Sequence, residues 1–183
     1  MKLFIATAFA ATLSFSAVAS AQTAEFKCPA TGTEFTFRSG GVDLKSVASG
    51  QEESVCLLSR GAGDKAVTVR MYWGLVGSVD AAGESFVRGL DLKSLWPLKV
   101  GNKSVQTVNG VGYDGKPYTT NVTITVAAYE KITGPAGTFD AFRVEENKAG
   151  ESKPRTHWWA PALSMSIKEM SDYAPKGIER IQF

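Results

Sequence analysis

The sequence has few of the residues from which metal sites are usually built. Its 183 residues include one histidine and two cysteines. A structural zinc site usually takes four Cys or His ligands, so one is hard to assemble from these three side chains. No motif in the chain indicates a cofactor. We therefore expect neither a metal nor a cofactor.

Long apolar runs and blocks of like charge are missing as well. Beyond the N-terminal region, no segment approaches the roughly 18 consecutive apolar residues that a membrane-spanning helix requires. The chain has 20 Lys and Arg against 18 Asp and Glu, and the two signs are interspersed. Nucleic-acid-binding domains usually carry a basic patch. We expect a chain that does not span a membrane and does not bind nucleic acid.

The N-terminus has the pattern of a secretory signal peptide. Lys2 gives a positive start, residues 3–13 are largely apolar, and Ala19 and Ala21 occupy the small-residue positions of an A-x-A cleavage site. The alternative is a buried N-terminal helix. We predict a signal peptide over residues 1–21. The remaining chain, 22–183, would be a single β-rich domain in the periplasm or secreted.

The two cysteines, Cys28 and Cys56, both follow the predicted cleavage site. In an oxidising compartment such a pair usually forms a disulfide, which is the interpretation we favour. Two free thiols, or a metal-binding pair without enough partner ligands, are the alternatives. Cys28 follows "EFK" rather than small residues, so we do not expect a lipid anchor on it.

Short segments rich in Val, Thr and aromatic residues alternate with turn signals, which is typical of an antiparallel β-protein. The predicted turns lie at 39–41, 61–64, 81–84, 113–117, 134–137, 148–154 and 174–177. Alternation with a period of two indicates strands with one buried face. The expected inward residues are Phe35 and Phe37; Val67, Val69 and Met71; Val122, Ile124, Val126 and Ala128; and Leu163, Met165 and Ile167.

The stretch "ITGPAGTFDAFRVEE" (132–146) is predicted to be a β-hairpin. Its first residues end a long strand, "GPAG" supplies the turn, and a second strand returns with Phe142 and Val144 on one face. Every residue in the stretch is accounted for by this structure, so we assign it no catalytic role.

Two short helices are expected, at 43–49 and 91–96. Each begins with an Asp that can accept hydrogen bonds from the first backbone N–H groups of a helix. The second should end before Pro97, because the residue preceding a proline disfavours the α conformation. The match between "GVDLKS" and "GLDLKS" leaves two explanations open. Segments 41–73 and 89–126 are an internal duplication, or they share turn chemistry by coincidence.

Catalytic signatures are weak throughout. His157 is the only histidine, and no serine lies in a G-x-S-x-G motif that would pair it with a nucleophile. "GVGYDG" (110–115) lacks the Lys-Ser/Thr ending of a phosphate-binding loop and fits a hairpin turn better. An exported hydrolase is therefore a weaker hypothesis than a protein without catalytic activity.

Three segments together resemble a group of exported bacterial β-sheet domains of unknown function. They are "LWPLKVG" (95–101), "GPAGTFDAFRVEE" (134–146) and "HWWAPALSMSIKE" (157–169). The resemblance covers roughly residues 89–170 and brings no activity with it. It implies an extended antiparallel sheet curved into an open or half barrel, a shape similar to periplasmic carriers of lipidated proteins.

The fold we predict is mainly β, a curved antiparallel sheet or partial barrel with one or two short helices across its open side. An incompletely covered apolar face would leave a groove, and apolar concavities bind ligands. The first hypothesis is a periplasmic, non-enzymatic binding or carrier protein for an apolar or amphipathic ligand, with a lipid or an envelope protein as partner. From aromatic character alone, the expected wall residues are Trp73, Trp96, Phe142 and Trp158.

The alternative hypothesis is an interaction or structural module of the cell envelope that pairs with a partner through a sheet edge. A filled core and a long bare edge would favour it, whereas a cavity would favour the carrier. The sequence does not indicate an oligomeric state.

Overall fold

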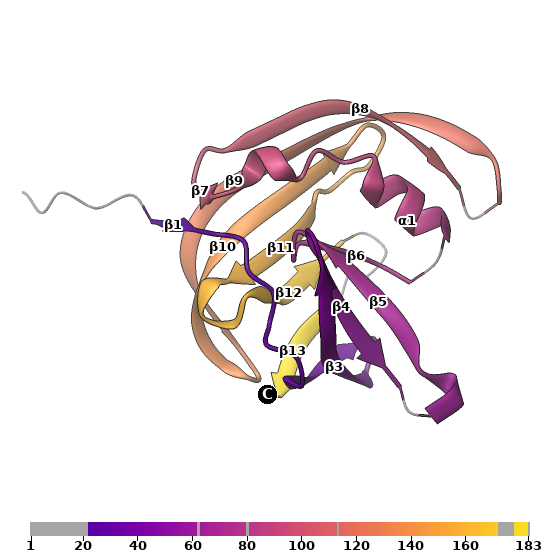
Figure 1. Ribbon diagram of the computed structural model, residues 1–183. Helices are drawn as coiled ribbons and strands as arrows, with labels where there is room; N and C mark the ends of the chain where they lie inside the picture. Colours follow the sequence, from indigo (N-terminus) through magenta and orange to yellow (C-terminus); the bar gives the residue numbers. More distant parts are fainter. Residues whose placement is uncertain (1–21, 62, 80, 113, 172–177, 183) are drawn as a thin grey trace, which may run out of the picture.

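The computed structural model describes residues 22–61, 63–79, 81–112, 114–171 and 178–182 (Figure 1). The predicted signal peptide lies outside these residues, and so does the turn expected at 174–177. Among the helices in the described ranges, none is long and apolar enough to cross a membrane.

One antiparallel sheet of eleven strands forms most of the protein, in the order β6-β5-β4-β3-β2-β13-β12-β11-β10-β9-β8. The strands are β2 (Glu34–Ser39), β3 (Val42–Glu52), β4 (Val55–Arg60), β5 (Val67–Tyr72), β6 (Val76–Ser78), β8 (Lys103–Val111), β9 (Pro117–Gly134), β10 (Gly137–Lys148), β11 (Arg155–Ala160), β12 (Met165–Met170) and β13 (Ile178–Gln182). A separate pair joins β1 (Thr23–Ala24) to β7 (Leu98–Lys99). The helical elements are α1 (Ala81–Arg88) and the 3-10 turns η1 (Gly63–Lys65), η2 (Lys93–Leu95) and η3 (Pro161–Leu163).

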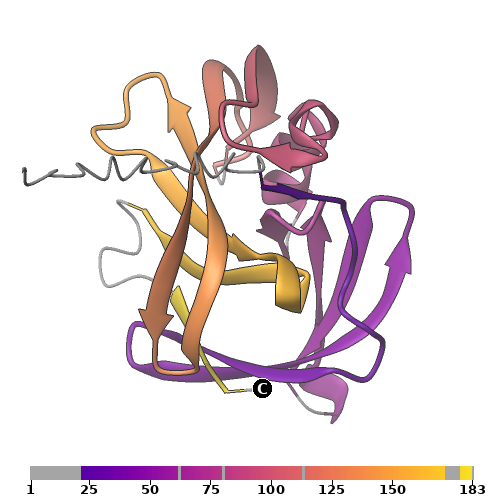
Figure 2. The same cartoon turned by 90° about the vertical axis from the view of Figure 1, so that its left-hand side faces the viewer.

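The sheet curls into an incomplete barrel, as the two perpendicular views show (Figures 1 and 2). Its edge strands are β6 and β8, and helix α1 contacts both of them. The helix therefore bridges the opening between the two edges. The predicted fold class, a mainly β protein with a curved antiparallel sheet and a short helix, is confirmed.

The alternation predicted for the longest strand is confirmed from Val122 to Val126, but a bulge then places Ala128 opposite Arg143 and out of the core. Val122, Ile124 and Val126 of β9 are at most 2% exposed and lie in the main core. The hairpin at 132–146 forms as expected, with Gly137 paired to Gly134 at the start of β10. The main core lies within the curl and is completed by α1 and by the leucines around η2. Its members outside β9 include Phe86, Val87, Leu90, Leu92, Leu95, Leu98, Phe142, Val144 and Trp159.

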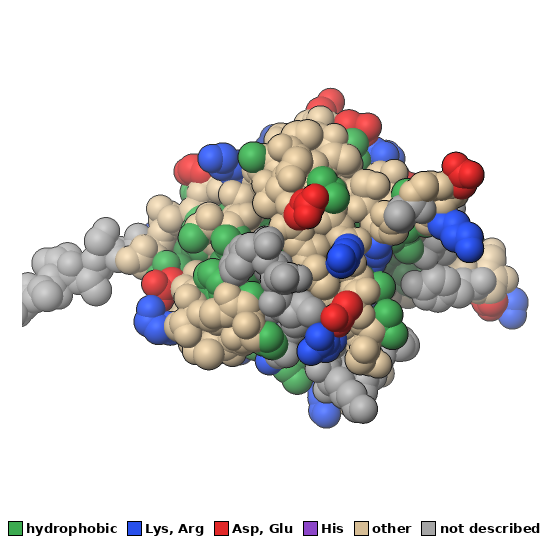
Figure 3. Space-filling view, turned by 90° about the horizontal axis from the view of Figure 1, so that it is seen from below, with side chains coloured by type: hydrophobic (Ala, Val, Ile, Leu, Met, Phe, Trp, Pro, Cys, Tyr) green, Lys and Arg blue, Asp and Glu red, His purple; other side chains and the backbone are tan. Residues whose placement is uncertain are grey.

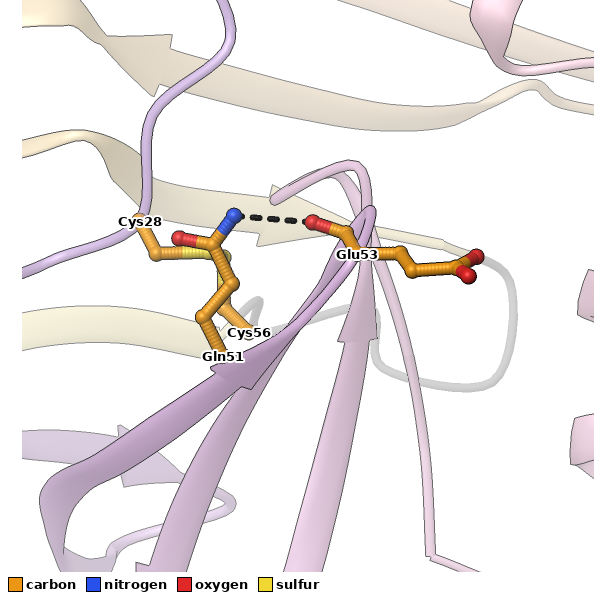
Figure 4. Close-up of a disulfide and its surroundings, with 4 residues drawn as sticks. All are labelled: Cys28, Gln51, Glu53 and Cys56. Atoms are coloured by element: carbon orange, nitrogen blue, oxygen red, sulfur yellow. Dashed lines mark hydrogen bonds between the residues drawn. A yellow bond between two sulfur atoms is a disulfide. The ribbon is translucent and has the colours of Figure 1, made fainter.

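The curled sheet has two limbs, one formed by β2–β6 and the other by β8–β12, and an N-terminal strap, residues 22–33, crosses between them (Figure 1). One end is held by the pairing of β1 with β7. Cys28 forms a disulfide with Cys56 of β4, with their Cα atoms 5.5 Å apart, so the predicted disulfide is confirmed. Figure 4 shows this bond beside Gln51, whose side-chain amide donates to the carbonyl oxygen of Glu53 at 2.8 Å.

The helix predicted at 43–49 is wrong, because these residues belong to strand β3. Asp43 does not cap a helix. It lies opposite Arg38 on β2 and accepts two hydrogen bonds from that guanidinium, at 2.7 and 3.0 Å. Tertiary pairing with β2 and β4 therefore overrides the local signal. The inward positions Leu44, Ser46 and Ala48 do alternate, but a serine among them obscured the pattern.

The turn predicted at 81–84 is wrong as well, because helix α1 covers it. Phe86 and Val87 are buried, and Glu84 forms an i,i+4 ion pair with Arg88 at 2.6 Å. Burial of the helix face outweighs the unfavourable helix propensity of a glycine in "AAGE".

The helix expected at 91–96 is present as the 3-10 turn η2. Its N-cap residue is Leu92 rather than Asp91, but Oδ1 of Asp91 accepts a hydrogen bond from the Ser94 N–H at 3.3 Å. Trp96 is extended before Pro97. The two "DLKS" copies thus have different structures, a strand and a 3-10 turn. The shared arrangement of cap and helix expected for an internal duplication is not found.

Candidate ligand-binding cavity

A cavity of about 220 Å³ lies inside the curl. It separates β2 and β4–β6 on one side from β11 and β12 on the other. Apolar side chains form much of its wall, namely Phe37, Leu58, Val69, Met71, Leu75, Val79 and Met165. Its polar lining comes from Arg60, Ser78, Arg155, Ser166, Lys168 and Glu169.

Cross-strand register explains the apolar wall. Leu58 lies opposite Val69, and Met71 lies opposite Gly77. A Cβ atom on Gly77 would be 2.6 Å from the Met71 sulfur, so the glycine leaves the space that the methionine side chain occupies. Met165 of β12 packs in one cluster with Leu58 and Val69 from the facing limb. The two limbs thus contact each other through side chains that line the cavity.

Arg60 places a guanidinium in this lining. It is half-buried, and its Nε donates a long hydrogen bond of 3.4 Å to the hydroxyl of Ser46 on β3. Burial lowers the pKa of Arg60 below its ordinary value, although far from any range in which it would lose its charge. Among the described side chains, no carboxylate forms a salt bridge with it.

Ser166 adds a buried hydroxyl. Its residue is 9% exposed, and its Oγ has no hydrogen-bond partner in the described part of the chain. A buried hydroxyl usually finds a partner, because leaving it without one costs roughly 1–3 kcal/mol. The cavity therefore contains a polar group that a bound molecule can satisfy.

Arg155, His157 and Glu169 form a polar cluster where β11 meets β12. The Nε of Arg155 donates to Oε1 of Glu169 at 2.8 Å, and Nδ1 of His157 lies 3.7 Å from Oε2 of the same carboxylate. Burial raises the pKa of Glu169, but His157 and Arg155 outweigh this effect and hold it below its usual value. The positive charge of Arg155 is thus compensated within the protein.

His157 is 1% exposed, and burial lowers the pKa of its imidazole. Neither ring nitrogen has a hydrogen-bond partner among the described residues. The arrangement that would support a hydrolase, a Ser or Asp hydrogen-bonded to His157 within a cleft, does not occur in the described part of the chain.

Of the four aromatic residues predicted as cavity walls, Trp73, Trp96 and Phe142 belong to or pack against the main core, and Trp158 lies in a separate cluster. None of them lines the cavity. Trp73 and Trp96 both contact Phe26 of the N-terminal strap, with ring centroids 5.0 and 5.5 Å apart. Phe142 is fully buried in the main core against Tyr129. Their assignment to ligand binding stays a prediction, and their packing indicates a structural role for these three.

Trp158 lies on the other face of the sheet from Trp159, as expected for neighbours on a strand. Its indole N–H donates to Oε1 of Glu130 at 2.8 Å, and the ammonium of Lys168 lies 5.9 Å from its ring centroid. It packs in a small cluster with Ala141 and Ala160. Trp158 therefore belongs to the convex face, away from the cavity.

Sequence reasoning missed Arg60 and Ser166. A signal for Arg60 was present, because it follows Leu58 at a spacing of two on a strand and must share its inward face. A charged residue at an inward position indicates either a buried partner or a ligand. Ser166 had no comparable signal, since a bulge between β11 and β12 changes the local register.

The face of the molecule seen from below carries charges of both signs (Figure 3). Figure 3 shows acidic and basic side chains interspersed over the face seen from below, with apolar patches between them. On this face, no single sign of charge dominates.

Comparisons with known proteins add the following findings. No protein-family model matches the chain, and no curated protein matches it significantly. Among solved structures, the hypothetical lipoprotein YmcC from Escherichia coli (K12) is similar, with a TM-score of 0.48 and 10% identity over 82% of this chain and 83% of the other. Similarity at this level carries no argument about function. The family resemblance of residues 89–170 stays a prediction.

Proposed function

We propose that this protein is an exported, non-enzymatic binding or carrier protein for an apolar or amphipathic ligand. The observation that carries the proposal is the cavity of about 220 Å³ between the two limbs of the curled sheet. Protein interiors are normally packed with few voids larger than a water molecule. An apolar engineered cavity of about 150 Å³ holds benzene, so this one is large enough for a small apolar group.

Location outside the cytoplasm, in the periplasm or beyond, is part of the proposal. The signal-peptide pattern of residues 1–21 supports it, and so does the disulfide between Cys28 and Cys56, because such bonds persist mainly in oxidising compartments.

Methionine-methyl NMR tests the proposal directly. Met71 and Met165 line the cavity, whereas Met170 does not line it and is 39% exposed. Titration with octan-1-ol, a small neutral amphiphile, should shift the isotope-labelled methyl signals of Met71 and Met165 and leave that of Met170 in place. Equal shifts at all three, or none, would argue against a cavity ligand.

A matched pair of variants supplies the control. Val69→Phe adds volume inside the cavity, whereas Val105→Phe adds the same volume on β8, outside the lining, at a side chain that is 69% exposed. Val69→Phe should weaken octanol binding at least about tenfold, and Val105→Phe should not. Urea unfolding of both variants separates lost binding from lost folding. Equal binding by the two would contradict the proposal.

Pairing through a sheet edge, the alternative, is favoured by one observation. Strand β8 (Lys103–Val111) ends the sheet, and its outward residue Val105 is 69% exposed. Helix α1 contacts both β8 and the opposite edge strand β6, so part of each edge is covered. Native mass spectrometry of the exported protein distinguishes the two functions. A bound small molecule supports the carrier, and a stable complex with another protein supports the module.

A further inference from the structure

We propose that the cavity takes a ligand with one apolar chain and a terminal oxyanion, a carboxylate or a phosphate monoester, and that this oxyanion pairs with Arg60. The inference rests on the proposed function and narrows its ligand to one chemical class.

The uncompensated charge of Arg60 is the first reason to expect an anionic ligand. Its guanidinium lines the cavity, and its Nε reaches only the Ser46 hydroxyl, at 3.4 Å. Within the described residues it has no carboxylate partner. A partly desolvated cation without a counter-ion is unfavourable, and a bound anion would remove this cost through charge-assisted hydrogen bonds. The guanidinium is also suited to oxyanions, because its planar fork matches carboxylate and phosphate geometry.

The other basic residues of the lining, Arg155 and Lys168, differ from Arg60 in their surroundings. Two nitrogens of Arg155 lie 2.8 Å from Oε1 of Glu169, so its charge is already compensated. Lys168 has its ammonium 5.9 Å from the ring of Trp158, a residue of the convex face. Arg60 is therefore the lining cation that remains for a ligand's negative charge.

Ser166 gives an independent indication. Its buried Oγ lines the cavity and has no partner in the described part of the chain. A hydroxyl in this position can donate to an acceptor oxygen, as an oxyanion provides. An entirely apolar ligand would leave the charge of Arg60 without a counter-ion and the hydroxyl of Ser166 without a hydrogen-bond partner.

The size and lining of the cavity indicate the apolar part of the ligand. Its volume of about 220 Å³ is below the roughly 300–1,000 Å³ of sites for drug-sized molecules, which favours one short chain over two. Val69, Met71 and Met165 offer that chain an apolar wall, and the flexible methionines can adapt to it.

Four probes with the same chain test the inference: octanoate, octyl phosphate, octan-1-ol and octylammonium. Binding is measured by calorimetry, with the Met71 and Met165 methyl signals confirming the site. We expect at least one of the two anions to bind about tenfold or more tightly than octanol, and octylammonium to bind most weakly, because a hydrogen bond to a charged group contributes about that much. The tighter anion identifies the head group.

Arg60→Met should remove the advantage of the anions over octanol. Arg38→Met is the matched control, because Arg38 is exposed and pairs with Asp43 outside the cavity. Arg60→Lys keeps the charge and should retain part of the preference, so it decides the question if the methionine variant does not fold. Binding of octanol as tight as that of both anions overturns the inference but leaves the proposed function standing. No binding of any probe overturns both.

Discussion

The Nδ1 atom of His157 lies 3.7 Å from Oε2 of Glu169, and the imidazole is 1% exposed. The ring is enclosed by charged residues of three neighbouring strands, with Glu146 on β10, Arg155 on its own strand β11 and Glu169 on β12. Burial dominates over the attraction of the two carboxylates and lowers the pKa of His157 below 6.5. The protein therefore holds a neutral histidine in a place where a proton would be unfavourable.

Stability should fall as the solution becomes more acidic than about pH 6.5. A histidine whose folded-state pKa is lowered binds fewer protons when folded than when unfolded, so acid favours the unfolded chain. The contribution of His157 is complete above the unfolded pKa of 6.5 and is lost as the pH falls from there toward the folded value. The loss should not exceed about 1.4 kcal/mol per pH unit. Urea unfolding at pH 7.5 and pH 5.5 measures it.

His157→Leu is the control for this effect. It removes the titrating group and two buried nitrogens without partners, and it should flatten the dependence between pH 7.5 and 5.5. Glu169 affects the pH dependence of stability only at lower pH, because its pKa is held below 4.5. An unchanged slope in His157→Leu would mean that another group titrates in this window.

The strands were predictable from the sequence where apolar residues occupy every inward position. In β9, Val122, Ile124 and Val126 all face the core, and the alternation was plain. In β3 the inward set includes Ser46, which is 2% exposed, so an aspartate at the start of the segment suggested a helix instead. What decided the structure of β3 was its pairing with distant residues of β2 and β4, which local propensity does not contain.

The candidate site was less predictable, for a related reason. Trp96 and Phe142 were chosen as cavity walls for their aromatic character, and their role in binding stays a prediction; in the structure both pack in or against the main core, as large apolar side chains mostly do. The cavity instead uses medium-sized side chains such as Val69 and Met71, whose arrangement depends on how the two limbs of the sheet curl toward each other. Curvature arises from twist, bulges and packing across the whole sheet, and no short segment encodes it.

Phe142→Ala should destabilise the protein severely, because the ring is fully buried and lies 4.7 Å from the ring of Tyr129. The expected loss is about 3–5 kcal/mol, from lost burial and the void left behind. Val105→Ala, at a position 69% exposed, should cost less than about 1 kcal/mol. Urea unfolding compares the two. A stable Phe142→Ala protein with weakened octanol binding would show instead that Phe142 serves as a ligand wall.

Removal of the disulfide should loosen the N-terminal strap. The bond between Cys28 and Cys56 spans a sequence separation of 28 residues, for which the chain-entropy model gives about 3–4 kcal/mol. The double variant Cys28→Ala/Cys56→Ala should lose roughly this much stability, and amide exchange of Ala24 in β1 should accelerate. Adding reductant to the unchanged protein is the control. Identical unfolding midpoints with and without the bond would refute the prediction.

In the turn between β5 and β6, Trp73 has an unfavourable backbone conformation and also contacts Phe26 of the N-terminal strap. Trp73 and Gly74 both have positive φ angles, 52° and 64°, and the N–H of Leu75 donates to the carbonyl of Tyr72 at 3.1 Å. Tyr72 pairs with Val76, so residues 73–75 connect the two strands, and the positive φ angles favour Gly or Asn. A tryptophan in the left-handed region costs roughly 1–2 kcal/mol. Its contact with Phe26 must offset that cost.

The Trp73→Asn variant compares the free energy lost with the Phe26 contact against the backbone strain that is relieved. Asparagine tolerates the left-handed conformation but removes the contact with Phe26, so we expect a net loss of about 2 kcal/mol. Glu53→Asn is the matched control, because Glu53 also has a positive φ of 47° but is exposed, and it should gain up to about 1 kcal/mol. Urea unfolding of both variants gives the comparison. A gain at both positions would mean that the aromatic contact of Trp73 with Phe26 contributes less than the backbone strain at Trp73.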